Sequence, residues 1–250
     1  MNPVRVGHMF GLLYYDPYFW VTIPGILIAF WAQMRLSSAY GRQSRVGTAR
    51  GVTGAEAARH ILDRNGMANV EVYRVQGHLT DHYDPSKRAV FLSSEVHDTP
   101  SVAAVGIAAH EVGHAIQHKT GYAWLGVRMA MVGMTGFASK ASWFILMAGM
   151  ILANMSPRGG LGRTLMFWGI VLFAVTVAFQ VITLPVEYDA SSRAKRELDR
   201  LGIIIPEERA AVSSVLSAAA LTYVAGMVSA ILELLHLLLI FRGQRGSDDR

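Results

Sequence analysis

The sequence contains no cysteine, and charged residues make up only 16% of its 250 positions. The lack of cysteine excludes disulfide frameworks, thiol nucleophiles, cysteine-ligated zinc and iron–sulfur clusters, so a metal would have to be held by histidine and carboxylate. The 52% content of hydrophobic residues excludes a disordered chain. The 23 Lys and Arg residues outnumber the 18 Asp and Glu residues, but few of them form basic and aromatic clusters, so we expect no nucleic-acid partner.

The hydrophobic residues are concentrated in long runs. The stretch 19–34 holds no charge and, at about 1.5 Å per residue, nearly crosses a hydrocarbon core of about 30 Å. Further apolar runs occupy 129–153, 164–185 and 210–241. We therefore expect a mainly α, polytopic helical membrane protein with about four transmembrane helices that lies in a lipid bilayer.

The region 35–128, between the first two runs, has the composition of a soluble domain. Alternating residues at 70–75 and a β-prone run at 89–92 predict a small strand pair, with the turn-rich segment 82–87 between them. A helix of small residues is predicted over 102–118. We expect this region to hold the chemistry of the protein.

The predicted helix carries the motif His110-Glu111-Val112-Gly113-His114. Residues four apart lie about one turn apart on the same helix face, so both imidazoles can reach one tetrahedral cation at about 2.0–2.1 Å. Glu111 is rotated away from them and can take a proton from a water molecule that attacks a peptide carbonyl. The motif thus predicts two zinc ligands and a general base. In the alternative interpretation, the three are ordinary surface residues of an alanine-rich helix.

A catalytic zinc ion usually has three protein ligands, and the third is expected near another helix on the same membrane face. Glu187 is the best candidate, because it follows Pro185, which can open a helix after the third apolar run. Glu187 could instead be an acidic first-turn residue that the helix dipole favours. Asp189 is a weaker ligand candidate and a plausible partner for a histidine N–H.

Three further residues are candidates for a role near the reacting atoms. Arg193 could stabilise an anionic tetrahedral intermediate, or it could pair with Asp189 one turn before it. His82 and Asp84 could act on the substrate, on the developing oxyanion or on a second metal. A purely structural role in their turn-rich segment is the alternative for both.

Five tracts together resemble the YugP-type neutral zinc metallopeptidases, and the resemblance covers nearly the whole chain. The tracts are 77–85, 92–93, 108–117, 184–193 and 218–225. That family is similar to the HtpX-like and CAAX-prenyl-type membrane endopeptidases. In these, His-Glu-x-x-His is followed, after a transmembrane hairpin, by a glutamate ligand that opens Glu-x-x-Ala-Asp.

The resemblance implies a gluzincin-like site with one zinc ion, in which His110, His114 and Glu187 are the ligands and Glu111 is the base. It also implies that the tract 79–85 lies where the relatives pair a strand with an extended substrate. One position departs from the pattern, because Ser191 stands where the distant relatives have aspartate. The role of that aspartate is therefore not carried over, and Asp189 is its only suggested replacement.

Together these patterns predict an integral membrane zinc endopeptidase that acts on a peptide or protein substrate. The alternative is an inactive membrane scaffold or adaptor that retains a structural metal. The positive-inside bias predicts a plasma-membrane protein with a cytoplasmic active site, and the oligomeric state is left open. The predicted segments are an N-terminal region with the first transmembrane helix (1–34), a cytoplasmic catalytic region (35–128), a transmembrane hairpin (129–185), a cytoplasmic helix with the third ligand (186–209), an apolar helix (210–241) and a tail (242–250).

Overall fold

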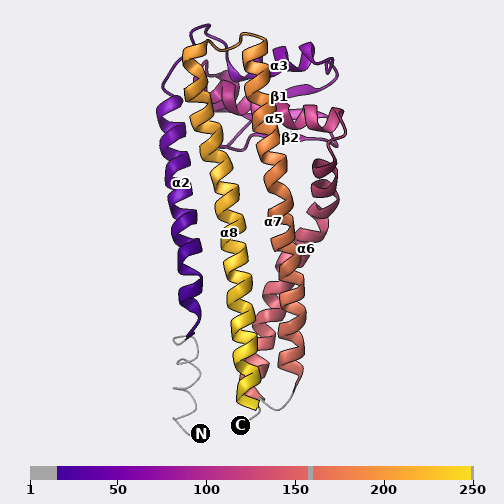
Figure 1. Cartoon of the computed structure of the whole chain (residues 1–250). Coiled ribbons are helices and arrows are strands. Elements are labelled where there is room, and N and C mark those ends of the chain that lie inside the picture. Colours follow the sequence, from indigo (N-terminus) through magenta and orange to yellow (C-terminus); the bar gives the residue numbers. More distant parts are fainter. Residues whose placement is uncertain (1–15, 157–159, 249–250) are drawn as a thin grey trace. The chain divides into compact units, whose positions relative to one another are not determined.

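The computed structural model describes residues 16–156 and 160–248, and most of them are helical (Figure 1). The helices are α2 (Ile23–Gln43), α3 (Gly54–Arg64), α4 (Ser94–Asp98), α5 (Val102–Lys119), α6 (Ala123–Met155), α7 (Leu161–Arg200) and α8 (Arg209–Asp248), with short 3-10 helices at Phe19–Val21 and Pro206–Glu208. The strands are β1 (Glu71–Val75), β2 (His82–Asp84) and β3 (Ala89–Ser93).

Four helical segments of the described chain are long and apolar enough to cross a membrane, which confirms the predicted polytopic, mainly α class. They are Phe19–Gln43, Ala123–Met155, Leu161–Arg200 and Pro206–Gly243. Large apolar side chains on them are exposed, for example Phe30, Phe137 and Phe144. Such surfaces are unfavourable in water and suited to contact with lipid.

The chain divides into two compact units, and all four long helices run through both. The first unit comprises residues up to Ala29, Gly133–Ala178 and the chain from Gly226 onward. In it α6 and α7 approach closely: a Cβ added at Gly162 would lie 2.3 Å from the backbone nitrogen of Ala153. Small residues at such crossings let helix backbones pack together within a membrane.

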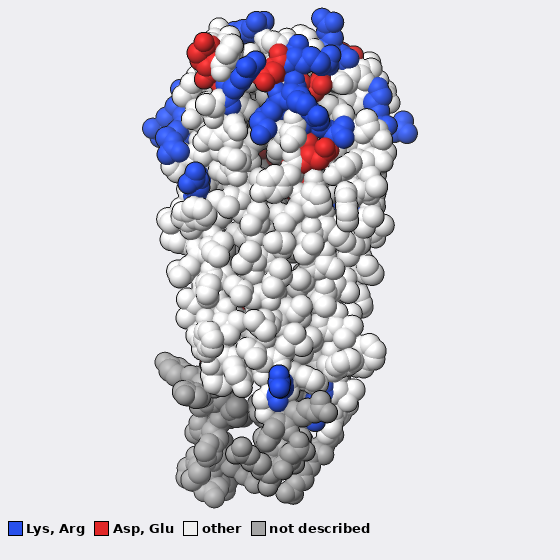
Figure 2. Space-filling view, viewed as in Figure 1, with Lys and Arg blue, Asp and Glu red and all other residues white. Residues whose placement is uncertain are grey.

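The second unit, Phe30–Val132 and Phe179–Ala225, contains α3, α4, α5 and the sheet. Its core is formed by fully buried side chains such as Ile61, Leu62, Leu92, Val105 and Leu198. The strand order is β1-β3-β2, with β1 parallel and β2 antiparallel to β3. Most of the charged side chains lie on this unit, whereas the described residues of the first unit present a largely uncharged surface (Figure 2).

Two local features differ from the sequence-based predictions. The segment expected to be a turn contains β2, because His82, Tyr83 and Asp84 pair with Phe91, Val90 and Ala89. The second difference is that α7 continues through Pro185, which was expected to open a new helix. Proline removes only one backbone donor, and helices of membrane proteins accommodate it.

Candidate metal centre

Helix α5 places His110, Glu111 and His114 on its inner side. Ser101 caps the helix, and its side chain accepts a hydrogen bond from the backbone N–H of Ala104. Most of α5 is buried in the second unit, where Glu111 is 9% and His114 7% exposed. The two imidazole rings lie 4.8 Å apart between centroids and are nearly perpendicular. The interpretation of these residues as ordinary surface groups is therefore wrong.

Glu187 reaches the same point from α7. Its Oε2 lies 3.1 Å from Nε2 of His110 and 3.6 Å from Nε2 of His114. Ligand atoms about 2.0–2.1 Å from a tetrahedral zinc ion are separated by about 3.4 Å, and the two observed distances lie on either side of that value. The three residues are the group of the described chain whose ligand atoms can hold a metal ion, and their donor set suits zinc.

The other nitrogen of each imidazole already has a partner. Nδ1 of His110 lies 3.1 Å from the Ser191 hydroxyl oxygen, and Nδ1 of His114 lies 3.0 Å from Oε1 of Gln117. The Gln117 oxygen can only accept, so Nδ1 of His114 carries a proton, and in the neutral ring Nε2 presents a lone pair. A ligand histidine is held in this way in many metal sites.

Gln117 connects His114 to residues on either side of Glu187 in α7. The side chain is fully buried, and its Nε2 donates to the Val186 carbonyl at 2.8 Å and to the Asp189 carboxylate at 2.9 Å. Arg193 donates to the same carboxylate at 2.6 Å. Asp189 therefore acts on His114 through Gln117, and Ser191 makes the direct contact with His110. Arg193 makes the pairing that sequence reasoning considered as its alternative, and it is not among the residues that line the cavity described below.

Glu187 is almost completely buried, at 1% exposure, and it lies well inside α7. The interpretation of Glu187 as a first-turn residue is therefore wrong. Its second oxygen, Oε1, lies 3.1 Å from a guanidinium nitrogen of Arg128 in α6. Burial of a carboxylate is costly unless charged or polar partners surround it, and here the imidazoles and Arg128 are those partners.

Gly113 lets α5 and α7 come close enough for the three ligand candidates to meet. A Cβ added at Gly113 would lie 2.5 Å from the carbonyl oxygen of Ala190, which is closer than atoms can approach. The glycine inside the motif is therefore required by packing, and a larger residue would separate the histidines from Glu187.

A cavity of about 400 Å³ opens beside these residues. It is lined by the three ligand candidates, Glu111, the segment 81–86, Tyr223 of α8, and Leu125, Arg128, Met129 and Val132 of α6. The structure thus brings His82 and Asp84 to the site. The pKa of Asp84 is lowered by hydrogen bonds, first from the Ser86 hydroxyl, whereas burial raises the pKa of Asp81.

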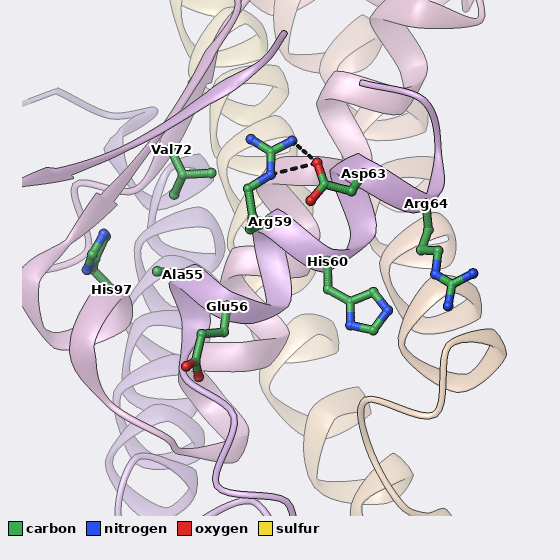
Figure 3. Close-up of a pocket in the computed structure, with 8 residues that line it drawn as sticks. All are labelled: Ala55, Glu56, Arg59, His60, Asp63, Arg64, Val72 and His97. Atoms are coloured by element: carbon green, nitrogen blue, oxygen red, sulfur yellow. Dashed lines mark hydrogen bonds and ion pairs between the residues drawn. The ribbon is translucent and has the colours of Figure 1, made fainter. Parts of the chain in front are cut away.

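A second depression, over α3, does not resemble a reaction site (Figure 3). Arg59 in it pairs with Asp63 and donates to the carbonyls of Val70 and Met67. Its two histidines, His60 and His97, lie on separate elements and do not point toward each other (Figure 3). We therefore place the site in the cavity at α5.

Sequence reasoning did not identify Gln117, Arg128 or Tyr223 as residues of the site. Gln117 lies three residues after His114, and this spacing could have indicated a partner for the imidazole. Arg128 is a single cation at the start of an apolar helix, where positive charge is common for reasons of topology. Tyr223 lies in one of the tracts that carry the resemblance, but nothing in the sequence shows which way it points.

The comparisons with known proteins agree with this geometry. Residues 18–242 match a family model described as "Putative neutral zinc metallopeptidase". The chain is also 43% identical, over 91% of its length and 98% of the relative, to "Putative membrane protease YugP" of Bacillus subtilis (strain 168). No solved structure matches it significantly.

Proposed function

Since the chain belongs to this family of neutral zinc metallopeptidases, we propose that it is an integral membrane zinc endopeptidase of the His-Glu-x-x-His type. In the proposal, His110, His114 and Glu187 hold one zinc ion and Glu111 is the general base. The observation that carries it is the convergence of a buried carboxylate from α7 on two imidazoles of α5, at 3.1 and 3.6 Å. A surface pair of histidines would not require a buried acid between them.

Zinc bound there would polarise the scissile carbonyl and make water a better nucleophile at neutral pH. Glu111 lies on the same helix and lines the same cavity, so it can accept the proton as the water oxygen bonds to the carbonyl carbon. The π electrons of the carbonyl then move to its oxygen. When they return, the C–N bond breaks and Glu111 gives its proton to the leaving nitrogen, which yields a carboxylic acid and an amine. At neutral pH the acid loses its proton and the amine gains one, so the products are a carboxylate and an ammonium group.

The substrate is proposed to be an extended peptide or protein segment that lies along β2. Among the described strands, β2 pairs with β3 alone, so its other edge is free to accept a further strand. Backbone hydrogen bonds at such an edge bind a peptide without requiring one sequence. The segment 81–86, which contains β2, forms one wall of the cavity that holds Glu111.

The proposed location is the plasma membrane, with the site on the cytoplasmic face. The polar segments 35–128 and 187–209 contain 11 and 5 of the 23 basic residues. Lys and Arg in short loops, or close to the ends of a transmembrane segment, favour retention of that end in the cytoplasm during insertion. Both segments supply ligand candidates, so they must share one face if the site is to form.

Hydrolysis of a fluorogenic peptide or casein by the purified full chain tests the proposal. The wild type should cleave, a chelator should stop cleavage, and Glu111→Gln should keep its zinc while losing hydrolysis. Glu71→Gln removes the same charge from an exposed residue of β1 and should behave as wild type. A zinc-loaded wild type without hydrolysis would favour the scaffold alternative, and undiminished cleavage by Glu111→Gln would refute the mechanism.

A further inference from the structure

We propose that Tyr223 of α8 donates the hydrogen bond that stabilises the oxyanion of the tetrahedral intermediate, and that Arg128 of α6 is a positioning residue for Glu187. The proposal rests on the proposed function, since it assigns roles for hydrolysis at that same site. It also gives a role to the tract 218–225, which contains Tyr223 and which the ligand set and the base leave unused.

The side-chain donors on the β2 wall of the cavity are already engaged. Nδ1 of His82 lies 2.8 Å from the Thr80 carbonyl, so in the neutral ring this nitrogen carries the proton and Nε2 can only accept. The hydroxyl of Tyr83 lies 2.8 Å from Nδ1 of His118. The hydroxyl of Ser86 donates to Asp84. The side chains of this wall therefore present acceptors or committed hydroxyl groups to a developing oxyanion, and the free backbone edge of β2 is assigned to the peptide chain.

Two donors remain among the described residues of the opposite wall, Arg128 and Tyr223. Arg128 is committed to Glu187: its Nη1 lies 3.1 Å from Oε1, while Oε2 of the same carboxylate faces the two imidazoles. This division of the two oxygens fixes the rotation of the carboxylate. Arg128 therefore acts on the reaction through the position of Glu187.

Tyr223 is the residue of α8 in the wall of the cavity. It lines the cavity together with Glu111, and its side chain reaches the Glu187 carboxylate. A phenol carries one O–H group that it can donate to an oxyanion. A donor held by a helix, rather than by a loop, needs little reorganisation when charge develops on the carbonyl oxygen.

Tyr223→Phe removes the donor and keeps the ring. We expect kcat to fall by about 10²–10³-fold with little change in KM, as for the loss of other oxyanion donors. Affinity for zinc should fall much less than kcat, because Arg128 still holds Oε1 of Glu187. Affinity for a peptide with a tetrahedral phosphonate in place of the scissile amide should fall by a factor similar to that in kcat, because this compound resembles the intermediate.

Tyr188→Phe is the matched control. Tyr188 is the residue next to Glu187 in α7, and it is 51% exposed. The same substitution there should leave kcat, zinc affinity and phosphonate affinity at wild-type values. An equal fall in kcat and phosphonate affinity for Tyr188→Phe and Tyr223→Phe would overturn the specific role of Tyr223.

Arg128→Gln should act on the affinity for zinc. Without the guanidinium, Glu187 loses the partner of its second oxygen, and zinc affinity should fall by about 10- to 100-fold. Arg128→Lys keeps the charge and should recover part of that affinity. Zinc affinity is measured by competition with a chromophoric chelator, which requires no turnover.

The outcomes separate this proposal from the proposed function. If the wild type binds zinc and cleaves while Tyr223→Phe keeps wild-type kcat and phosphonate affinity, the role of Tyr223 is overturned and the endopeptidase remains. If Arg128→Gln binds zinc normally but loses kcat and phosphonate affinity, Arg128 is the oxyanion donor and our assignment is wrong. A wild type that neither binds zinc nor cleaves overturns both proposals.

Discussion

The hydroxyl oxygen of Ser191 lies 3.1 Å from Nδ1 of His110. Ser191 follows Glu187 by four residues on α7. One turn of α7 thus supplies both a ligand candidate and the group that orients another ligand. At this position the distant membrane endopeptidases that the chain resembles carry aspartate. The shorter, uncharged serine makes the contact here because Gly113 allows the two helices to approach so closely.

Ser191→Ala should weaken zinc binding by about 10- to 100-fold, because His110 loses the partner that fixes its ring. Competition with a chromophoric chelator measures the change. Ser192→Ala, at the exposed neighbouring position, is the control and should leave the affinity unchanged. Equal affinities for Ser191→Ala and wild type would show that the contact does not orient His110.

Gly113→Ala should destabilise the protein by about 1–3 kcal/mol and reduce zinc content, because its Cβ would meet the Ala190 carbonyl at 2.5 Å. Gly106→Ala is a matched control on the same helix. A Cβ there would lie 3.5 Å from a methyl group of Val212, an ordinary contact, and alanine favours a helix over glycine. In detergent, the unfolding temperature should be lower for Gly113→Ala than for the wild type and should not be lower for Gly106→Ala. Equal unfolding temperatures for the two variants would contradict the packing argument.

Zinc should stabilise the protein more as the pH rises through the neutral range. Burial lowers the pKa of His114, but the hydrogen bond and the charge of Glu187 outweigh it, so in the metal-free protein this pKa lies above its usual 6.5. Protonated His114 therefore stabilises the metal-free fold most below pH 6.5, and this contribution is lost as the pH rises through the raised pKa. Zinc must displace that proton, so its affinity increases over the same window.

The measurement is the zinc-induced rise in the unfolding temperature between about pH 6 and pH 8, the range in which histidine titrates. His60→Ala, which removes an exposed histidine of α3, should keep the dependence. A zinc-induced rise in the unfolding temperature that is the same at every pH in the wild type would contradict the coupling of His114 to the metal.

The long elements of the fold could be predicted from the sequence because their signals are local. Apolar runs that nearly cross or exceed the thickness of a bilayer identified the four membrane-capable helices, and a small-residue run identified α5. Strand β2 was missed because its pairing with β3 depends on residues outside the segment, while its own residues favour turns. The continuity of α7 through Pro185 was missed because a local rule on proline is weaker than packing on both sides of it.

The candidate site was predictable only in part, for a similar reason. The spacing of His110 and His114 shows by itself that they share a helix face. The contacts of Ser191 with His110 and of Arg128 with Glu187 join different elements, and no periodicity reports them. Gln117 lies on the same helix as His114, but its spacing alone does not show that the two side chains meet. Residues that position a ligand therefore emerge from the structure, whereas the motif that binds the metal can be recognised in the chain.

The zinc content of the purified full chain tests the central claim most directly, with wild type, His114→Ala, Glu187→Ala and Asp189→Ala prepared in parallel. The account predicts one zinc ion per wild-type chain and a large loss in His114→Ala and Glu187→Ala. Asp189→Ala should keep much more of its metal, since Asp189 contacts Gln117 rather than the candidate metal position. Full zinc content in Glu187→Ala, with loss in Asp189→Ala instead, would contradict the account.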